Sequence, residues 1–333
     1  MSEESVQRTN DDATQCKMSA VAHGYWEDSY LSAFHKIRSG PDSRKAPEIH
    51  RGYYTRVKAI WNLLVKSIDY FCSRDQKFQV VNLGAGFDTL FWRISDHLEK
   101  CSWLHKLNSF VDIDLSEVTA KKCMAVRKSK LLLEKISQYN NEDECNDEVK
   151  FSRTDLHGAT YHIVATNFTD LKTLESKLEE CGVNYALPTI FIAECVFVYV
   201  DPNKTSAFLQ WISTRFRSAP IALINHEQLN IFDRFGQVML ENLAQRGCAL
   251  PGIEACRNKT SHLNRMLENG WQNGYCWTMN EIYNYLPKDE VERIEKLEFL
   301  DERELMCQLF EHYCVSFAWK SCDGYKLEEI DFW

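Results

Sequence analysis

Several features that would assign a protein class at once are missing from this sequence of 333 residues. Basic residues number 39 against 48 acidic ones, and the net charge of −9 argues against a general nucleic-acid binder. No apolar run approaches the roughly 18–20 residues of a membrane span, and the first ten residues contain no apolar signal segment. We therefore expect a cytoplasmic protein with neither a nucleic-acid nor a membrane partner.

Glycine and proline are also scarce, at 13 and 7 residues, which favours long regular elements over a loop-rich scaffold. The 13 cysteines include no C-x-x-C pair. Zinc ribbons and thioredoxin-type sites are therefore not indicated, and we expect no metal site. Scattered cysteines in odd number are typical of a reducing compartment, where most thiols are small core residues.

Short apolar runs alternate with helical stretches from residue 78 onwards. Five such runs predict strands: 78–83, 109–113, 161–165, 189–193 and 220–225. Strands that alternate with helices of about 10–15 residues form βαβ units. The pattern therefore predicts an α/β protein with a mostly parallel sheet that helices cover on both faces.

The first part of the chain divides into a tail and a helical region. Residues 1–15 are polar and predict a disordered tail, and a single domain follows over 16–333. Within it, 16–75 predict a helical cap, because apolar residues recur there at helical spacing. The acidic stretch within 128–152 predicts an exposed surface loop.

The last part of the chain predicts a helical insertion and then a return to strands. The segment 228–290 is expected to be helical and to form part of the substrate site. The runs 291–300 and 312–320 predict two final strands that pair at an edge of the sheet. Because these strands would complete the sheet, 228–290 is an insertion and not a separate domain.

The sharpest motif is the turn Gly84-Ala85-Gly86 between the strand at 78–83 and the following helix. Glycine at these positions lets a ligand approach the backbone closely. A dinucleotide fingerprint has a third glycine where this chain has Thr89, and a carboxylate at Asp88 is unfavourable beside a pyrophosphate. A cofactor with a sulfonium and an amino group, such as S-adenosylmethionine, agrees better with these residues. The alternative is a tight turn without a ligand.

Polar side chains also follow the next three predicted strands. Asp112 and Asp114 can accept both hydroxyls of a ribose, although capping of the next helix is the alternative. Asn167 and Phe168 offer an amide and an aromatic face to an adenine ring, and Glu194 adds a carboxylate. Each signal alone is weak. Together they predict a ligand site, because open parallel sheets bind ligands at the carboxyl ends of their strands.

Six blocks of the sequence resemble the leucine carboxyl methyltransferases. The blocks are RKAPEI at 44–49, RGY at 51–53 with Arg56, VNLGAGFDTLFWR at 81–93, IAECVFVY at 192–199, NHEQLNIFDRFGQVMLENL at 225–243 and KLEFLDERELM at 296–306. The resemblance implies a Rossmann-like class I methyltransferase fold, with a mostly parallel seven-stranded sheet and an antiparallel last strand. It further implies a monomer that uses S-adenosylmethionine to methylate the C-terminal leucine carboxylate of the catalytic subunit of protein phosphatase 2A.

The resemblance also implies a role for each matching residue. Gly84 and Gly86 line the methionine part of the cofactor, and Asp114 holds the ribose, with Asp112 as the alternative. Asn167 and Phe168 stand where the family has Asp-Leu at the adenine.

At the reactive end, Glu194 contacts the cofactor. Lys17 and Arg56 bind its carboxylate and border the carboxylate of the substrate. Tyr199, Tyr25 and Trp26 are candidates for the pocket wall, with plain core packing as the alternative.

This chemistry needs no catalytic base. An α-carboxyl group has a pKa of about 3.3–3.7 and is already ionised at neutral pH. The residues have to position the carboxylate and exclude water. Two competing hypotheses remain. The protein could be a nicotinamide-dependent oxidoreductase with the same doubly wound fold, or a non-catalytic relative that binds a partner's tail.

Overall fold

A computed structural model describes residues 3–37, 45–139, 149–245 and 247–333 of the chain. The described helices include none that is long and apolar enough to cross a membrane. The predicted loop at 128–152 lies partly outside the described residues, because 140–148 are not among them. Helix α5 (Lys130–Ser137) occupies the beginning of that stretch.

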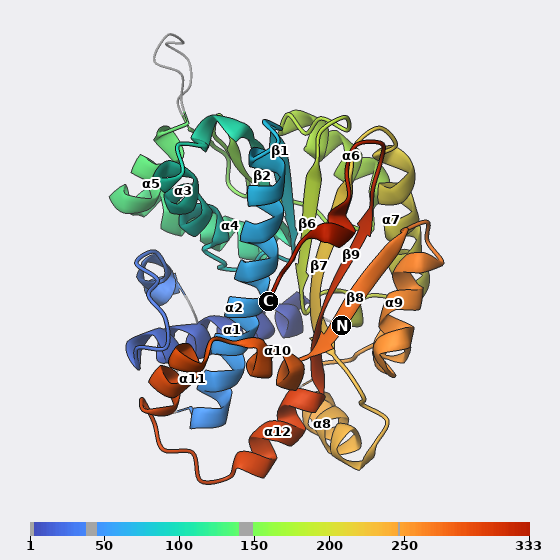
Figure 1. Cartoon of the computed structure of the whole chain (residues 1–333). Helices are drawn as coiled ribbons and strands as arrows, with labels where there is room; N and C mark the ends of the chain where they lie inside the picture. The colour runs from blue at the N-terminus through green and yellow to red at the C-terminus, as the bar shows by residue number, and fades with distance from the viewer. Residues whose placement is uncertain (1–2, 38–44, 140–148, 246) are drawn as a thin grey trace.

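One mixed sheet runs through the molecule (Figure 1). Its strands are β1 (Phe78–Leu83), β2 (Leu107–Asp114), β3 (Lys150–Phe151), β4 (Leu156–His157), β5 (Tyr161–Ala165), β6 (Thr189–Glu194), β7 (Ile221–Gln228), β8 (Asn273–Thr278) and β9 (Tyr313–Lys320). Their order is β3-β4-β5-β2-β1-β6-β7-β9-β8. The pairs from β5 to β7 are parallel, and β9 runs antiparallel to both β7 and β8. The predicted fold class is confirmed. Within the described residues the sheet has nine strands instead of seven, because β3 and β4, two residues each, extend its β5 edge.

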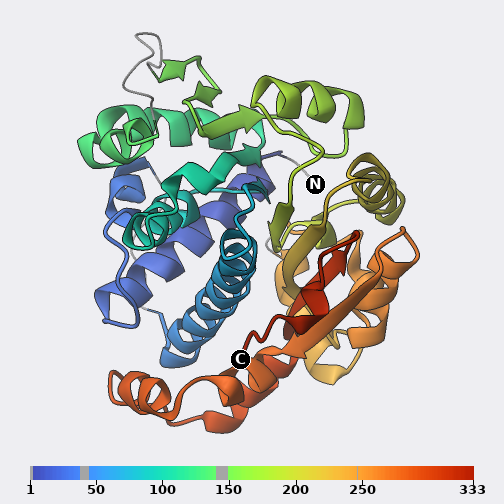
Figure 2. The ribbon, with the colours of Figure 1, turned by 45° about the horizontal axis from the view of Figure 1, so that its top comes forward.

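Helices cover both faces of this sheet, as the two ribbon views show (Figures 1 and 2). The remaining helices are α1 (Glu3–Ala22), α2 (Pro47–Cys72), α3 (Leu90–Lys100), α4 (Ser116–Lys128), α6 (Leu171–Glu180), α7 (Pro202–Arg215), α8 (Arg234–Gln245), α9 (Lys259–Leu267), α10 (Met279–Tyr285), α11 (Lys288–Glu295) and α12 (Arg303–Glu311). One core cluster joins the sheet to α2, α3 and α4, and a second joins it to α6, α7 and α9.

Strand β1 shows why the central strands read as continuous apolar runs. All six of its residues are buried. Val80 belongs to the first core cluster and its neighbour Val81 to the second. Successive side chains point to opposite faces of a strand, so a strand covered on both sides needs apolar residues at every position.

The predicted disordered tail is wrong for the described residues, because 3–15 belong to helix α1. Thr14, Cys16 and Ala20 of this helix are buried, and α1 lies against α2. The polar composition of the first 15 residues hid the helix. Its buried contacts are made with distant parts of the chain, and a local pattern does not reveal those.

The predicted strand at 291–300 is also wrong. Residues 288–295 form α11, and within it Ile294 is buried. Val291 and Ile294 are three residues apart, which places them on one side of this helix.

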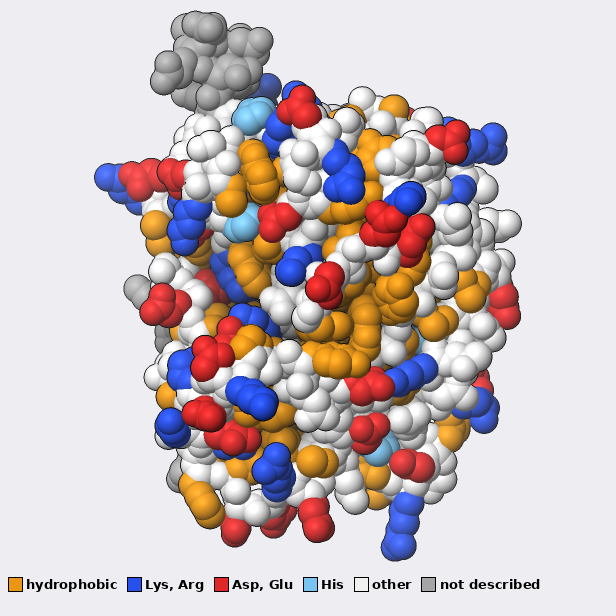
Figure 3. Space-filling view, viewed as in Figure 1, with side chains coloured by type: hydrophobic (Ala, Val, Ile, Leu, Met, Phe, Trp, Pro, Cys, Tyr) orange, Lys and Arg blue, Asp and Glu red, His pale blue; other side chains and the backbone are white. Residues whose placement is uncertain are grey.

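The partner of β9 is instead β8, which lies inside the predicted helical insertion at 228–290. The rest of that segment includes α8, α9 and α10, so it is only partly helical. Tyr275 and Trp277 of β8, two residues apart, pack on each other and Tyr275 also packs on Trp319 of β9. Figure 3 shows hydrophobic side chains gathered on the face that carries β8, β9 and the chain's end.

Candidate active site

A cavity of about 1060 Å³ opens at the carboxyl ends of β1, β2, β5, β6 and β7. Nine residues predicted from the sequence line it: Lys17, Arg56, Gly84, Gly86, Asp114, Asn167, Phe168, Glu194 and Tyr199. They come together because parallel strands end at the same edge of a sheet, where α1 and α2 add their own side chains. Tyr25, Trp26 and Asp112 are not among the described residues that line this cavity.

The turn after β1 has a backbone that favours glycine at both positions. Gly84 has a φ of +58° and Gly86 a φ of +48°, in the left-handed region. A Cβ on Gly84 would lie 2.7 Å from a side-chain carbon of Val196. The turn is tied to the neighbouring strand, since the backbone N–H of Ala85 donates to the carbonyl of Ile113 at 3.0 Å. The bare backbone therefore forms one wall of the cavity.

Asp114 and Asp112, two residues apart on β2, have different environments. Asp114 lines the cavity, and its two carboxylate oxygens accept backbone N–H groups of Gly86 and Leu115, both at 2.7 Å. Burial raises the pKa of Asp114, although these hydrogen bonds oppose the effect. Each oxygen has a second lone pair that can accept a hydroxyl group.

Asp112 is a structural residue inside the protein. It is buried and accepts from Lys122 Nζ at 2.8 Å, Tyr161 Oη at 2.5 Å and Asn82 Nδ2 at 3.0 Å. Three donors satisfy its carboxylate away from the cavity. The geometry thus favours Asp114 as the residue that faces a ligand.

Glu194, at the end of β6, holds two cations from the helical cap. Its Oε2 accepts from Lys17 Nζ at 3.0 Å, and its Oε1 accepts from Arg56 Nε. Lys17 Nζ also lies 3.4 Å from Asp88 Oδ2. The side chains of Lys17, Arg56 and Glu194 are only 12–14% exposed.

Charge compensation decides the ionisation of this group. Burial acts to raise the pKa of Glu194, but Arg56 and Lys17 prevail and hold it far below its usual value. Burial acts to lower the pKa of Lys17, and Glu194 with Asp88 raises it above its ordinary value. The cluster is therefore fully ionised, with two cations at one end of a largely apolar cavity.

Asn167 and Phe168 both reach the cavity, but each is partly engaged elsewhere. Asn167 Oδ1 accepts from the backbone N–H and the hydroxyl of Thr169, at 3.0 and 2.9 Å. Phe168 packs edge-on against Phe208 with ring centroids 4.9 Å apart, and its relative exposure is 7%. The ring therefore belongs mainly to the core and offers only part of one surface to a ligand.

Sequence reasoning placed Lys17 of α1 at the site but missed the N-terminal part of the same helix. Arg8, Thr9 and Asn10 line the cavity. Asn10 Oδ1 accepts the backbone N–H of Phe87 at 3.0 Å, directly after the glycine turn. Nothing local in the polar sequence of 1–15 signals this contact, because it joins residues 77 positions apart.

A second group was missed at the end of β7. His226 lines the cavity, stacks on Tyr313 with ring centroids 5.6 Å apart, and has Nδ1 3.2 Å from Cys195 Sγ. Burial and the nearby Arg56 lower the pKa of His226 well below its usual value, so its ring is neutral. Burial raises the pKa of Cys195 to about 11. A signal existed here, since β7 ends at the same edge as β6 and its last residues, NHEQ, are polar.

The residues present fit S-adenosylmethionine. Gly84 and Gly86 line the cavity with bare backbone that a ligand can approach closely, Asp114 offers a carboxylate for ribose hydroxyls, and Lys17 with Arg56 suits a carboxylate. A twisted sheet with this strand order, an antiparallel β9 and a glycine turn after β1 defines a class I methyltransferase.

Comparisons with known proteins identify the family within this class. The family model described as Leucine carboxyl methyltransferase matches residues 5–213. Leucine carboxyl methyltransferase 1 of Rattus norvegicus is 38% identical over 330 residues, which cover 99% of this chain and 94% of the rat protein. The Caenorhabditis elegans protein of the same name is 39% identical over 317 residues, or 93% of this chain and 90% of its own length.

Among solved structures, a protein described as a methyltransferase of Thermobifida fusca has the same fold. It superposes with a TM-score of 0.50 at 9% identity and covers 87% of this chain and 94% of its own. The chain belongs to the leucine carboxyl methyltransferase family and is an S-adenosylmethionine-dependent carboxyl methyltransferase. The predictions of family, enzyme class and cofactor are confirmed.

Proposed function

We propose that the substrate is the C-terminal leucine α-carboxylate of the catalytic subunit of protein phosphatase 2A. The observation that supports this is the placement of Lys17 and Arg56, which meet at Glu194 inside the cavity. Two buried cations beside a space lined by apolar side chains suit an anionic chain end with an apolar residue. The rat and nematode relatives are both named for methylation of a leucine carboxyl group, which supports the same substrate.

The residues of the chain act by binding and orientation. When bound, S-adenosylmethionine would supply a methyl group on a cationic sulfur: a carboxylate oxygen would bond to the methyl carbon as the carbon–sulfur bond breaks, giving the methyl ester and a neutral thioether. Gly84, Gly86 and Asp114 would hold this cofactor, with Asn167 and Phe168 at its adenine. The substrate carboxylate is already ionised at neutral pH, so no protein group has to remove a proton.

Arg56 would fix the plane of the reacting carboxylate. It uses Nε–H for Glu194, and a guanidinium carries five N–H donors in a planar fork that binds carboxylates in a bidentate manner. Glu194 limits the positive charge at this point, so the carboxylate is oriented without being neutralised. Positioning of this kind is a large source of rate enhancement.

The walls of the cavity would keep water away from the reacting charges. Burial raises the pKa of the Tyr199 hydroxyl far above its ordinary value, so this group stays protonated and can donate a hydrogen bond. Exclusion of water strengthens each electrostatic contact inside the site. Cytoplasmic location and the monomeric state stay predictions.

Replacing Arg56 by lysine tests the orienting role. The charge remains but the fork is lost, so a charge-assisted hydrogen bond of about 1.5–3 kcal/mol is removed. We expect kcat/KM to fall by about 10–100-fold, measured by transfer of a labelled methyl group. Arg74, just beyond the other end of α2, lies over the ring of Tyr70 and provides the control Arg74→Lys. Equal losses in the two variants would contradict the role of Arg56.

The substrate itself is tested with phosphatase. Intact catalytic subunit, its C-terminal peptide and the same peptide with an amidated end are offered to the enzyme. We expect label on the first two and none on the amidated peptide, in an ester that alkali releases. Label on the amidated peptide, or on neither of the first two, would overturn the proposal. A rate much higher with intact phosphatase than with peptide would show contacts beyond the tail.

A further inference from the structure

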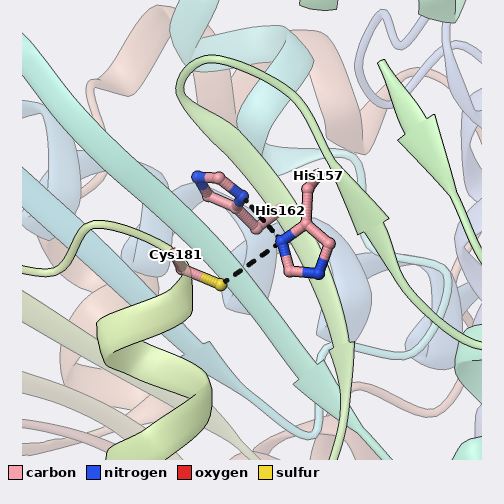
Figure 4. Close-up of side chains that lie close together, drawn as sticks. All are labelled: His157, His162 and Cys181. Atoms are coloured by element: carbon pink, nitrogen blue, oxygen red, sulfur yellow. Dashed lines mark hydrogen bonds between the residues drawn. The ribbon is translucent and has the colours of Figure 1, made fainter.

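Three potential metal ligands meet at the edge of the sheet far from the cavity. His157 of β4 and His162 of β5 stand directly opposite each other in the antiparallel register, and Cys181 follows the last residue of α6. Figure 4 shows the three side chains turned toward one another. His157 Nδ1 lies 3.3 Å from His162 Nδ1 and 4.0 Å from Cys181 Sγ. One donor atom from each residue lies within 4.8 Å of the other two.

The contacts of His157 Nδ1 cannot both be good hydrogen bonds. His157 Nδ1 carries either one proton or one lone pair. It can therefore form one good hydrogen bond along its ring plane, whereas two partners, His162 and Cys181, converge on it. Three lone pairs directed at one point are instead what a metal ion requires.

We propose that His157, His162 and Cys181 form a binding site for a borderline-soft divalent cation of the zinc type. Zinc binds imidazole nitrogen at about 2.0–2.1 Å and thiolate sulfur at about 2.3 Å in tetrahedral geometry. In tetrahedral geometry two nitrogen ligands then lie about 3.3 Å apart, and a nitrogen and a sulfur ligand about 3.6 Å apart. Two of the separations, 3.3 and 4.0 Å, are close to these values, and the third pair, His162 with Cys181, lies within 4.8 Å, so the side chains would have to draw together around an ion.

The protonation state of His162 favours such a site, whereas that of Cys181 has to change when an ion binds. Burial and the neighbouring ring of His157 lower the pKa of His162 to about 3, so its ring is neutral and can ligate. Burial raises the pKa of the Cys181 thiol to about 12. Binding would replace the thiol proton by the metal and release that proton to solvent. His157 is half-buried, so the site is open to solvent on the side of this residue. An ion would enter from that side, and a water molecule would occupy the fourth tetrahedral position there.

The site would lie apart from the catalytic cavity. His162 is the second residue of β5, whereas the catalytic cavity includes Asn167 beyond the other end of this strand. A cation at this place would join the β4–β5 hairpin to the end of α6. No C-x-x-C spacing marks it, because the three ligands come from three different elements.

A second group of potential ligands provides a contrast. Glu227, Cys256 and His262 are also close together. However, Glu227 already pairs with Arg265 at 2.7 Å and accepts the backbone N–H of Val198 at 2.6 Å. His262 Nε2 lies 2.8 Å from the carbonyl of Gln228. A dication here would lie beside the Arg265 guanidinium, so this group is not a metal site and serves as the control.

The test titrates the complete, tag-free protein with cobalt(II) in the absence of chelators, with thiols kept reduced. A cobalt–thiolate bond gives a charge-transfer absorption band, and tetrahedral cobalt gives intense d–d bands. We expect both at one equivalent of cobalt, and we expect zinc to abolish them. Cys181→Ser should remove the charge-transfer band. His157→Asn, at the half-buried position, should weaken zinc binding more than about tenfold, since even outer-shell partners contribute about 10–100-fold.

The control variant Cys256→Ser should keep the wild-type spectrum and affinity. Circular dichroism is used to check that each variant is folded. If Cys181→Ser does not fold, His157→Asn still tests the proposal. The proposal is overturned if the wild type shows no thiolate band at stoichiometric cobalt. A band that persists in Cys181→Ser, or one that disappears in Cys256→Ser, overturns it as well.

Discussion

Replacing Gly86 by alanine should destabilise the protein through two separable effects. The residue has a φ of +48°, and the left-handed conformation costs an alanine about 1–2 kcal/mol. Its new Cβ would lie 2.4 Å from Asn10 Oδ1, so the Asn10 side chain has to move. That movement breaks the hydrogen bond from the Phe87 N–H. A buried N–H left without a partner costs about 1–3 kcal/mol.

The two effects are separated by a double-mutant cycle with Asn10→Ala. Asn10→Ala alone removes the hydrogen bond and should cost about 1–3 kcal/mol. Gly86→Ala should cost about 2–5 kcal/mol, the sum of backbone strain and the lost bond. In the double variant the bond is already absent, so the total should equal that of Gly86→Ala alone. The expected coupling is therefore about 1–3 kcal/mol.

Urea unfolding followed by fluorescence and circular dichroism measures the four stabilities under one set of conditions. Calorimetric titration with S-adenosylmethionine on the same proteins shows whether the turn still binds the cofactor. Full additivity of the two substitutions would refute the reasoning. It would mean that α1 does not close over the glycine turn in solution, and that Asn10 belongs to a tail after all.

Two further predictions concern buried charge. Lys122→Met should destabilise the fold by about 3–5 kcal/mol, because it leaves the buried carboxylate of Asp112 without its cation. A cofactor affinity close to that of the wild type, measured by calorimetry, would confirm that this ion pair is structural. A large loss of affinity with an unchanged urea midpoint would contradict that role. Acidification should also weaken the fold. Burial lowers the pKa of His262 to about 4 and that of His226 well below its ordinary value. The contribution of these neutral rings to the free energy of unfolding is complete above about pH 6.5, the pKa of histidine in the unfolded chain. As the pH falls below this value the contribution is lost, at about 1.4 kcal/mol per pH unit for each ring. Urea midpoints at pH 7 and pH 5.5 measure this loss, and a constant midpoint would show that these rings are protonated in the folded protein.

Local sequence predicted the central sheet well. The run 78–83 is β1 and the run 161–165 is β5, with the predicted bounds. These strands are covered on both faces, so their apolar composition is continuous and depends little on which helix covers them. The position of Glu194 at the end of β6 followed from the same rule. Sequence was less informative at the edge of the sheet, where β8 is only partly buried and its pattern is weak.

The sequence by itself determined the class of protein, because the glycine turn, the acids that follow the strands and the family blocks are all contiguous signals. Tertiary structure alone decided which acid faces the cavity. Asp112 and Asp114 are two residues apart on one strand, but Lys122, Tyr161 and Asn82 surround only Asp112. It also decided that the polar N-terminal part of helix α1, ahead of Lys17, is part of the site. Asn10 meets Phe87 across 77 residues of chain, and contacts at such separation depend on packing, which local composition does not encode.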